Sequence, residues 1–404
     1  MPSKLQKLIE KYHPDGVEFV ELDGGCEKIF AGGTPKSTNA EYYNGNIPWL
    51  RSGEINFNSI VKTEKNIAEL GLKKSSAKWI RKKSVLLAMT GATVARSAVN
   101  EIALAANQSV CALEVAETLN YKFLYYFLAN NYQDIKDKGQ GILTSLNLDT
   151  IKRIRIPRPH IEVQKEIVRI LDAFTELTTE LTTELTLRKK QYEYYRDKLL
   201  SFDFAPNTKL YNLYKKYHPN GVEFKELGKV CEILDNLRKP VAKNKRVAGK
   251  YPYYGANGIQ DYVNDYIFDG DFLLIGEDGS VINKDKSPVL HWASGKIWVN
   301  NHAHILKETP LVNLRFVYFY MQTIDVSSIV MGLPPKINQQ NLKQIKLAIP
   351  HEEIQKEIVR ILDKFDTLTN DISEGLPAEI NLRKKQYEYY RDKLLTFKEK
   401  PRTS

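Results

Sequence analysis

The chain has 404 residues, of which 42 % are hydrophobic and 27 % are charged, and this composition excludes an intrinsically disordered protein. Its formal net charge of +10 favours a polyanionic partner, although many basic proteins bind no nucleic acid. Cys26, Cys111 and Cys231 lie far apart without a CxxC pair, so the sequence supports neither a disulfide framework nor a zinc knuckle. The sequence shows no signal peptide and no apolar stretch long enough to span a bilayer, so we expect a cytoplasmic protein without a membrane contact.

The chain repeats itself unevenly. Three blocks occur twice with nearly the same sequence, and in the longest pair 15 of 16 residues are unchanged. The pairs are Lys11–Phe19 with Lys216–Phe224, Gln164–Leu177 with Gln355–Leu368, and Leu187–Phe202 with Leu382–Phe397. The segments between these blocks match only weakly. We infer that one surface is needed twice in the same form and another twice in different forms, as in a protein with two copies of one partner and two different ligands.

Residues 1–157 form the first predicted globular domain. Short β-like runs such as Ser84–Gly91 alternate with glycine, proline and asparagine turns, and an apolar helical stretch follows at Tyr121–Tyr132. This pattern predicts an α+β fold with a curved sheet and peripheral helices. Lys62–Lys83 holds eight basic side chains and two acidic ones, a balance that suits DNA phosphates as well as it suits an ordinary soluble surface. The side chains that we expect to contact DNA are Thr34, Lys36, Arg51, Ser52 and Arg96.

Residues 158–203 form a predicted long helix. Apolar residues from Val163 to Phe202 recur in alternating steps of four and three, which is the signature of a coiled coil. No proline or glycine interrupts this run, so about 40 residues at ~1.5 Å each give a rod of roughly 60 Å. The sequence TELT occurs three times in Thr175–Thr186, where two successive steps of four predict a local unwinding of the supercoil.

Residues 204–349 form the second predicted globular domain, with the same mixture of short strands and helices. Asn236–Lys250 holds six basic residues and no acidic one, which again suits either phosphates or solvent. The side chains that we expect to contact DNA here are Arg238, Lys239, Lys243, Lys245, Arg246, Tyr254, Asn257 and Lys284. The sequence does not decide which of these candidates contacts a base.

Residues 350–404 repeat the helical pattern of the central helix. Between its two repeated blocks this segment is four residues longer and contains Gly375 and Pro377, which predict a kink or a break. The two long helices are expected to pair antiparallel in a pseudo-twofold arrangement, with the N-terminal segment packing where the C-terminal helix ends.

Core packing explains the apolar stripe of these helices but not why their outward residues are also repeated. A partner surface explains that repetition, because partner binding constrains outward positions. The predicted partner-binding residues are Arg188, Lys189, Tyr192, Tyr194, Arg383, Lys384, Tyr387 and Tyr389.

Motifs of catalysis are missing from the sequence. It contains no GxxxxGK[ST] loop for ATP and no GxGxxG loop for a dinucleotide. His302 and His304 suit a core or loop role better than a metal site, because two imidazoles alone do not make a full ligand set. Glu277 and Asp278 have no acidic counterparts in the other repeat. We therefore expect no catalytic residue, no metal and no cofactor.

Several longer motifs resemble one family throughout the chain. Gly32–Ile55, Tyr251–Tyr262 and Trp298–Leu306 are similar to target-recognition domains in specificity subunits of Type I restriction–modification enzymes. The phrases IPRPHIEVQKEIVRILD and IPHEEIQKEIVRILD resemble the start of that family's conserved helices. The doubled set, in the family's own order, is more specific than any one motif.

The resemblance implies a division of labour between the chain's segments. Each globule would read one half of a split target in double-stranded DNA, while the helices would set the spacing and bind two methyltransferase subunits. Methyl transfer and cleavage would occur on those subunits and on restriction subunits, which use S-adenosylmethionine and ATP. The TELT copies resemble a tandem repeat whose number changes the spacer.

Two other functions remain open at the level of sequence. A DNA methyltransferase or nuclease with built-in recognition would need a cofactor fold and a catalytic cluster, and neither motif is found. A coiled-coil scaffold with two modules that bind something other than nucleic acid would share the repeats. That scaffold would not need a basic excess in both globules, and a salt-sensitive shift of DNA would distinguish the two.

Overall fold

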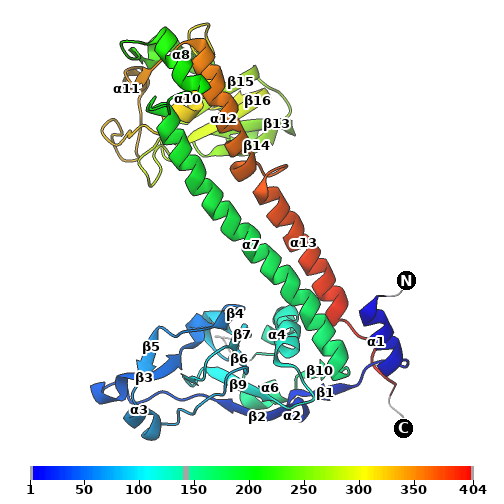
Figure 1. Cartoon of the computed structure of the whole chain (residues 1–404). Coiled ribbons are helices and arrows are strands. Elements are labelled where there is room, and N and C mark those ends of the chain that lie inside the picture. The colour runs from blue at the N-terminus through cyan, green and yellow to red at the C-terminus, as the bar shows by residue number, and fades with distance from the viewer. Residues whose placement is uncertain (1–2, 140–144, 402–404) are drawn as a thin grey trace. The chain divides into compact units, whose positions relative to one another are not determined.

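The computed structural model describes residues 3–139 and 145–401 of the chain. By their internal contacts the residues form two compact units: unit 1 contains Met1–Leu181 with Ile380–Ser404, and unit 2 contains Thr182–Glu379. Each unit therefore contains one globule together with part of each long helical segment (Figure 1). The predicted domain boundaries follow the repeated sequence blocks, whereas the two units are defined by internal contacts. The predicted boundaries therefore stay a prediction.

Unit 1 is built on a five-stranded sheet in the order β2-β9-β6-β7-β4. Its strands are β2 (Cys26–Ala31), β4 (Asn58–Ile60), β6 (Val85–Ala88), β7 (Ser97–Asn100) and β9 (Val110–Val115). All four side chains of β6 are buried, as its continuous apolar run predicts for a central strand. A three-stranded sheet and a two-stranded sheet complete the unit, formed by β5 (Lys65–Ile67), β3 (Tyr43–Leu50) and β8 (Ala105–Ala106), and by β1 (Phe19–Glu21) and β10 (Arg155–Pro157).

Short helices and turns surround these sheets. They are α1 (Lys4–Tyr12), α2 (Leu22–Gly25), α3 (Glu69–Lys73), α4 (Tyr121–Asn130), α5 (Tyr132–Lys136) and α6 (Leu148–Lys152), with 3-10 turns η1 (Ala40–Tyr42), η2 (Ser52–Glu54) and η3 (Gly91–Thr93). The Asn120 carboxamide accepts the first free N–H groups of α4, which fixes where that apolar helix begins. Its apolar side joins the buried residues of β6 and β9 in one core.

Unit 2 is built on a six-stranded sheet in the order β12-β17-β15-β16-β13-β14, with a separate pair of β11 and β18. The strands are β11 (Phe224–Glu226), β12 (Glu232–Ile233), β13 (Ala248–Gly255), β14 (Gly258–Val263), β15 (Phe268–Gly276), β16 (Leu290–Val299), β17 (Ala303–Lys307) and β18 (Lys346–Ala348). The helices and turns are α8 (Lys209–Tyr217), α9 (Leu227–Val230), α10 (Leu314–Met321), α11 (Gln339–Lys343), η4 (Asp235–Leu237) and η5 (Lys243–Lys245). The predicted α+β class is confirmed in both units.

The repeated blocks make the same contacts in both units. Lys4 on α1 pairs with the buried Glu166 at 2.8 Å, and Lys209 on α8 pairs with the buried Glu357 at 2.8 Å. Gln164 accepts the backbone N–H of Asn120 at 2.7 Å, just as Gln355 accepts that of Asn313 at 2.8 Å. The glutamines and glutamates of these contacts all lie in the repeated blocks Gln164–Leu177 and Gln355–Leu368. One framework is therefore built twice around two different globules.

The central helix is continuous. Helix α7 runs from Ile161 to Leu200, as predicted, and its TELT segment remains helical (Figure 1). The Thr175 and Thr179 hydroxyls donate to the carbonyls one turn earlier, at 3.0 and 2.8 Å, so these threonines satisfy their polar groups inside the helix. In unit 1, Phe174 of α7 stacks on Tyr390 with ring centroids 5.6 Å apart.

The C-terminal helical segment is broken where the sequence predicts a break. Helix α12 (Glu352–Asn370) ends before Asp371, and α13 (Leu376–Leu395) begins after Gly375. Asp371 accepts the backbone N–H groups of Ser373 and Glu374 at 2.6 and 3.2 Å, which closes a turn between the helices. A Cβ atom at Gly375 would lie 2.2 Å from the Thr367 carbonyl oxygen, so only glycine fits there.

Unit 1 also joins both ends of the described chain. The Val17 N–H donates to the Lys398 carbonyl at 2.8 Å, and the Lys400 N–H donates to the Val17 carbonyl at 2.9 Å. The expected packing of the N-terminal segment against the end of the C-terminal helix is confirmed. No helix of the described residues is long and apolar enough to cross a lipid bilayer.

A pair of histidines anchors the start of each long helix. His13 accepts the backbone N–H of His160 at 2.7 Å, and Tyr12 stacks on the His160 ring at 3.7 Å. The same contacts recur in unit 2, where His218 accepts the His351 N–H at 2.8 Å and Tyr217 stacks on His351 at 3.6 Å. In each pair the accepting nitrogen must be unprotonated, because a protonated one has no lone pair to offer.

This geometry predicts acid sensitivity. Burial, followed by the facing imidazole of His160, lowers the pKa of His13, and burial and His351 do the same to the pKa of His218. The charge of Lys400 also disfavours protonation of His13. The unfolded chain therefore binds more protons than the folded chain below about pH 6.5, and stability falls as the pH decreases from there.

We expect the melting temperature to fall between pH 7 and pH 5, and less so in the double variant His13→Gln, His218→Gln. Glutamine keeps an acceptor for the backbone N–H but does not titrate. Melting curves of both proteins across this range test the expectation. An equal pH slope in the two proteins would show that other groups carry the acid sensitivity.

Candidate nucleic-acid interface

The five predicted DNA-contacting residues of unit 1 lie on neighbouring loops. Thr34 and Lys36 are exposed after β2, and the Thr34 hydroxyl donates to the carboxamide of Gln108. Arg51 and Ser52 follow β3 and are half-buried. The loop that contains Ser52 contacts the loop that contains Thr93, because the Thr93 hydroxyl donates to the Ser52 carbonyl at 2.9 Å.

The remaining contacts decide which of these side chains can reach a ligand. Arg51 forms ion pairs with Glu64 and Glu54, so its charge is already matched. Arg96 donates to the Asn56 carboxamide oxygen at 2.9 Å. Among these candidates the charge of Arg51 is therefore matched inside the unit, while Thr34 and Lys36 remain exposed.

The basic segment Lys62–Lys83 lies on the surface of unit 1. All eight of its basic side chains are exposed. Two of them form ion pairs, Arg81 with Glu27 at 2.7 Å and Lys73 with Glu69 at 3.9 Å. The indole of Trp79, which is 50 % exposed, lies within this segment. An exposed basic strip with an accessible aromatic ring suits a polyanion with flat bases.

The eight candidates of unit 2 separate into two groups. Five of them are exposed and free to meet a ligand, namely Lys239, Lys243, Lys245, Asn257 and Lys284. Asn257 lies in the tight turn between β13 and β14. Tyr254 is buried in the core around β13 and β16, so the structure argues against a base contact by its ring.

Two arginines of unit 2 also turn inward. The Arg246 side chain is 14 % exposed, pairs with Asp261 at 3.3 Å and covers the Tyr253 ring at 4.1 Å. Arg238 is 12 % exposed and pairs with Glu277 and Asp235. The basic composition of Asn236–Lys250 makes these residues candidates for phosphate contacts, but their charges are matched inside the unit.

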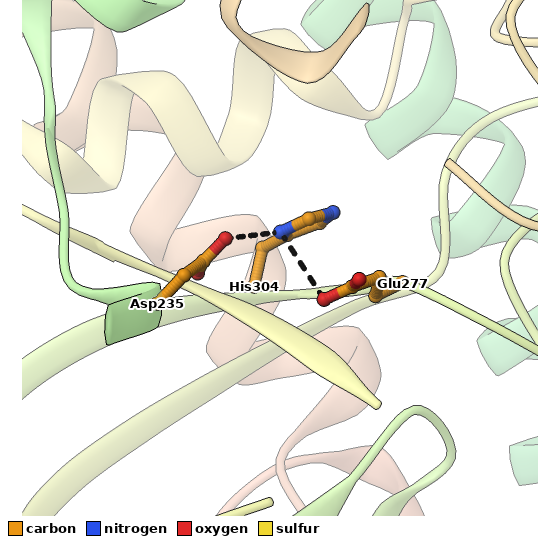
Figure 2. A group of neighbouring side chains, drawn as sticks. All are labelled: Asp235, Glu277 and His304. Atoms are coloured by element: carbon orange, nitrogen blue, oxygen red, sulfur yellow. Dashed lines mark hydrogen bonds and ion pairs between the residues drawn. The ribbon is translucent and has the colours of Figure 1, made fainter. Parts of the chain in front are cut away.

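A buried charged cluster lies at one end of the sheet of unit 2. Figure 2 shows Asp235, Glu277 and His304 pointing toward one another from η4, the end of β15 and β17. The Nδ1 atom of His304 lies 2.6 Å from Asp235 Oδ2 and 3.7 Å from Glu277 Oε2. Among the described residues this is the one group of His, Cys, Asp and Glu side chains close enough to hold a metal ion.

The hydrogen bonds of His304 disfavour a metal at this site. Its Nε2 atom lies 2.9 Å from the Ile337 carbonyl oxygen, which can only accept, so Nε2 carries a proton. Asp235 accepts the N–H of Ile305 at 3.0 Å and the carboxamide of Gln339 at 2.9 Å. Burial alone would raise the pKa of Asp235, but the hydrogen bond and charge of His304 outweigh burial and lower it. Asp235 is therefore ionised and Nδ1 donates to it.

The sequence analysis considers two of the three cluster residues, His304 and Glu277, and assigns neither of them to a metal site or a catalytic acid pair. Asp235 and Gln339 carried no signal, because they are distant in sequence and meet only in the folded sheet.

The repeated helix surfaces are partly as expected. Tyr194 and Tyr389 are each 60 % exposed, and Leu187 and Leu382 are 60 % and 59 % exposed. Tyr192 is instead buried in unit 2, where its hydroxyl donates to Gln322 at 2.8 Å.

The remaining predicted partner residues divide in the same way. Tyr387 is half-buried and packs against Phe174 in unit 1, so part of its ring faces the core of that unit. Lys189 and Lys384 are exposed. Arg188 and Arg383 are half-buried, and each donates to a glutamine one turn later at 3.0 Å.

A comparison with protein families decides between the candidate functions. The sequence pattern of the Type I restriction modification DNA specificity domain matches residues 14–188 and 219–382, which is most of the chain and both repeats. The chain belongs to this family. It therefore recognises a DNA target as part of a Type I restriction–modification complex, and the resemblance seen in its motifs is confirmed.

Individual relatives agree with this assignment. The Escherichia coli Type I restriction enzyme EcoprrI specificity subunit is 32 % identical over 398 residues, which cover 92 % of each protein. The Escherichia coli EcoR124I/EcoR124II specificity subunit is 34 % identical over 301 residues, covering 70 % of this chain and 72 % of that one. The Haemophilus influenzae protein S.HindORF215P, also named a type I specificity subunit, is 43 % identical over 183 residues, 44 % of this chain and 47 % of that protein.

Solved structures support the fold. The S subunit of a Type I restriction-modification system from M. genitalium matches with a TM-score of 0.62 at 16 % identity, covering 96 % of this chain and 97 % of that one. A chain from a structure of type I R-M complex assembly matches with a TM-score of 0.58 at 17 % identity.

Proposed function

We propose that the chain is a non-catalytic DNA-reading subunit, in which the globule of each unit reads one half of a split target. The observation that carries this proposal is the pair of units that share one framework but expose different loops. The repeated contacts hold equivalent residues of the two units in the same local arrangement. The divergent loops give each globule a different surface for base edges and phosphates. Catalysis would then belong to partner subunits.

The basic surface supports contact with double-stranded DNA. Eight exposed basic residues lie in Lys62–Lys83 of unit 1, and exposed lysines Lys239, Lys243 and Lys245 lie in unit 2. Such residues neutralise phosphates and release counterions, which gives affinity that falls steeply with salt. The scaffold alternative has no need for these two surfaces.

The exposed helix residues support two identical docking sites for methyltransferase subunits. Leu187 with Tyr194, and Leu382 with Tyr389, have nearly the same exposure in the two units. Exposed tyrosines beside leucines suit a protein partner, because aromatic anchors carry much of the energy of interfaces. Restriction subunits would join through that assembly, and we place the complex in the cytoplasm.

The experiment that tests this function is selection from a pool of random DNA duplexes by the full chain together with its methyltransferase subunit. The expected result is a motif with two fixed halves and a fixed gap, bound more weakly as salt increases. An assembled complex that selects no motif at any salt concentration would favour the scaffold function.

The TELT repeat gives a separate prediction about the gap. Deleting one TELT from Thr175–Thr186 removes four helical residues, about 6 Å of rise, comparable with one or two base pairs. We expect the selected gap to shorten while both half-sites stay the same. A Thr-to-Ala variant of the same repeat, which keeps helix length, serves as the control. Altered half-sites, or an unaltered gap, would contradict a role of α7 in spacing.

A further inference from the structure

The charged cluster of unit 2 replaces apolar packing that unit 1 achieves without charges. In unit 1 the N–H of Met89 donates to the Ser109 carbonyl at 2.8 Å, and in unit 2 the N–H of Glu277 donates to the His302 carbonyl at 2.8 Å. These matching bonds place Glu277 in the position of Met89. The end of β15 in unit 2 therefore corresponds to the end of β6 in unit 1.

The strand register extends the correspondence to the other two members. Ala31 pairs with Cys111 in unit 1, while in unit 2 Ile233 pairs with Leu306, which brings Asp235 opposite His304 two residues later. Ala31, Met89 and Cys111 thus stand where Asp235, Glu277 and His304 stand in unit 2. The fold tolerates an uncharged, well-packed set at these three positions.

Unit 2 therefore has buried charged residues at positions where the fold also accepts uncharged residues, and this difference needs a physical explanation. Buried ion pairs are on average no more stabilising than the apolar residues that could replace them, because removing charges from water is costly. His304 is fully buried, and its Nε2 faces a carbonyl oxygen while its Nδ1 faces the Asp235 carboxylate. Because both ring nitrogens face groups that accept, this geometry suits an imidazolium between two carboxylates. Arg238 and Lys336 supply two further positive charges, at positions where unit 1 has Thr34 and Ser145.

The cluster joins three loops at one end of the sheet. Asp235 directly precedes the basic segment Asn236–Lys250, Arg238 lies near the start of that segment, and Glu277 directly follows β15. Lys336 pairs with Glu277 at 3.1 Å, and Met331 and Lys336 exchange backbone hydrogen bonds of 2.7 and 2.9 Å. They close a hairpin whose tip residue Leu333 is 99 % exposed. The hairpin is held to the loop after β15 by its base, where the Gly279 N–H donates to the Pro335 carbonyl and the Ile337 N–H to the Glu277 carbonyl, both at 2.9 Å.

We propose that His304, held as an imidazolium between Asp235 and Glu277, is a positioning residue that fixes the start of the basic segment and the 331–336 hairpin of unit 2 for reading its half of the DNA target. This inference rests on the proposed function. His304 does not touch DNA; it acts through the two loops that its hydrogen-bond partners hold. Unit 1 reads a different half-site with an uncharged set, so the cluster is specific to the second half-site.

The test compares two variants of the charged cluster, one that leaves its buried carboxylates in place and one that removes all of its charges. His304→Cys leaves two buried carboxylates with less compensating charge, so it is expected to lower the melting temperature and to weaken selection of the second half-site more than about tenfold. The matched variant transplants the unit 1 residues: Asp235→Ala, Arg238→Thr, Glu277→Met, His304→Cys and Lys336→Ser. It is expected to regain the melting temperature but not the second half-site.

The readout is selection from random duplexes by the complete complex, with the first half-site as the internal control. A matched variant that reads the second half-site within about twofold of the original chain would overturn the proposal, since the cluster would then serve stability alone. If the matched variant does not fold, Gln339→Leu takes its place, because it removes one hydrogen bond to Asp235 and copies Leu148 of unit 1. It is expected to weaken the second half-site about threefold, and no change would overturn the proposal.

A spectroscopic measurement separates the charge of His304 from a metal site. Nitrogen NMR of the selectively labelled ring is expected to show both nitrogens protonated near neutral pH. A zinc or manganese ion that raises the melting temperature of the original chain, but not of His304→Cys, would overturn the imidazolium in favour of a metal. Loss of both half-sites in the original chain would instead count against the proposed function itself.

Discussion

Replacing Lys62, Lys65, Lys74 and Lys82 by glutamine is expected to weaken DNA binding by at least about a hundredfold at low salt. All four side chains are exposed on unit 1 and have no acidic partner among the described ion pairs. Each phosphate contact adds about 0.9 to the slope of log affinity against log salt, so the slope should fall by about three to four. Titrations of one duplex at several salt concentrations give both quantities.

The control for this experiment is a pair of exposed lysines on α1. Lys7→Gln with Lys11→Gln removes charge from the same unit, outside the basic segment. We expect it to leave the salt slope within experimental error of the original value. Equal losses in the two variants would mean that net charge alone, and not the Lys62–Lys83 surface, determines DNA affinity.

The second large effect is expected at the repeated helix surface. Leu187→Ala with Tyr194→Ala removes two exposed side chains from α7, and aromatic anchors at interfaces contribute about 2 kcal/mol or more each. The loss of one docking site should reduce the assembled complex from two methyltransferase copies to one. Native mass spectrometry of the assembled complex counts these copies directly.

The repeated sequence supplies a matched control for that loss. Leu382→Ala with Tyr389→Ala changes the equivalent residues, whose exposure is almost the same, and should remove the other copy. All four changes together should leave no copy bound. Retention of two copies in the fourfold variant would place the docking surface elsewhere on the chain. Melting temperatures should stay unchanged, because the exposed side chains contribute little to the core.

The pH dependence concerns the repeated framework, whereas the binding predictions concern exposed side chains. His13 and His218 lie at the start of the repeated framework, and their protonation affects the stability of both units. The lysine and tyrosine variants act on surfaces and leave that framework intact. A stability change and a binding change can therefore be measured independently in the same set of proteins.

Much of the architecture was determined by the sequence itself. The apolar stripe from Val163 to Phe202 predicted α7 because a helix buries one face at a fixed period, and Gly375 with Pro377 predicted the break between α12 and α13. The repeated blocks predicted a repeated framework, since identical residues in identical order form the same local contacts. The family followed from the same motifs.

Tertiary structure alone decided which candidates face outward and which groups meet. Tyr192 and Tyr194 are two residues apart, yet one is buried against Gln322 and the other is exposed, because only the packing of neighbouring elements selects a side of the helix. Asp235 and His304 are separated by 69 residues and meet through strand pairing that no local pattern specifies. Long-range contacts depend on how elements pack together, and a single sequence encodes that packing only in the sum of many weak interactions.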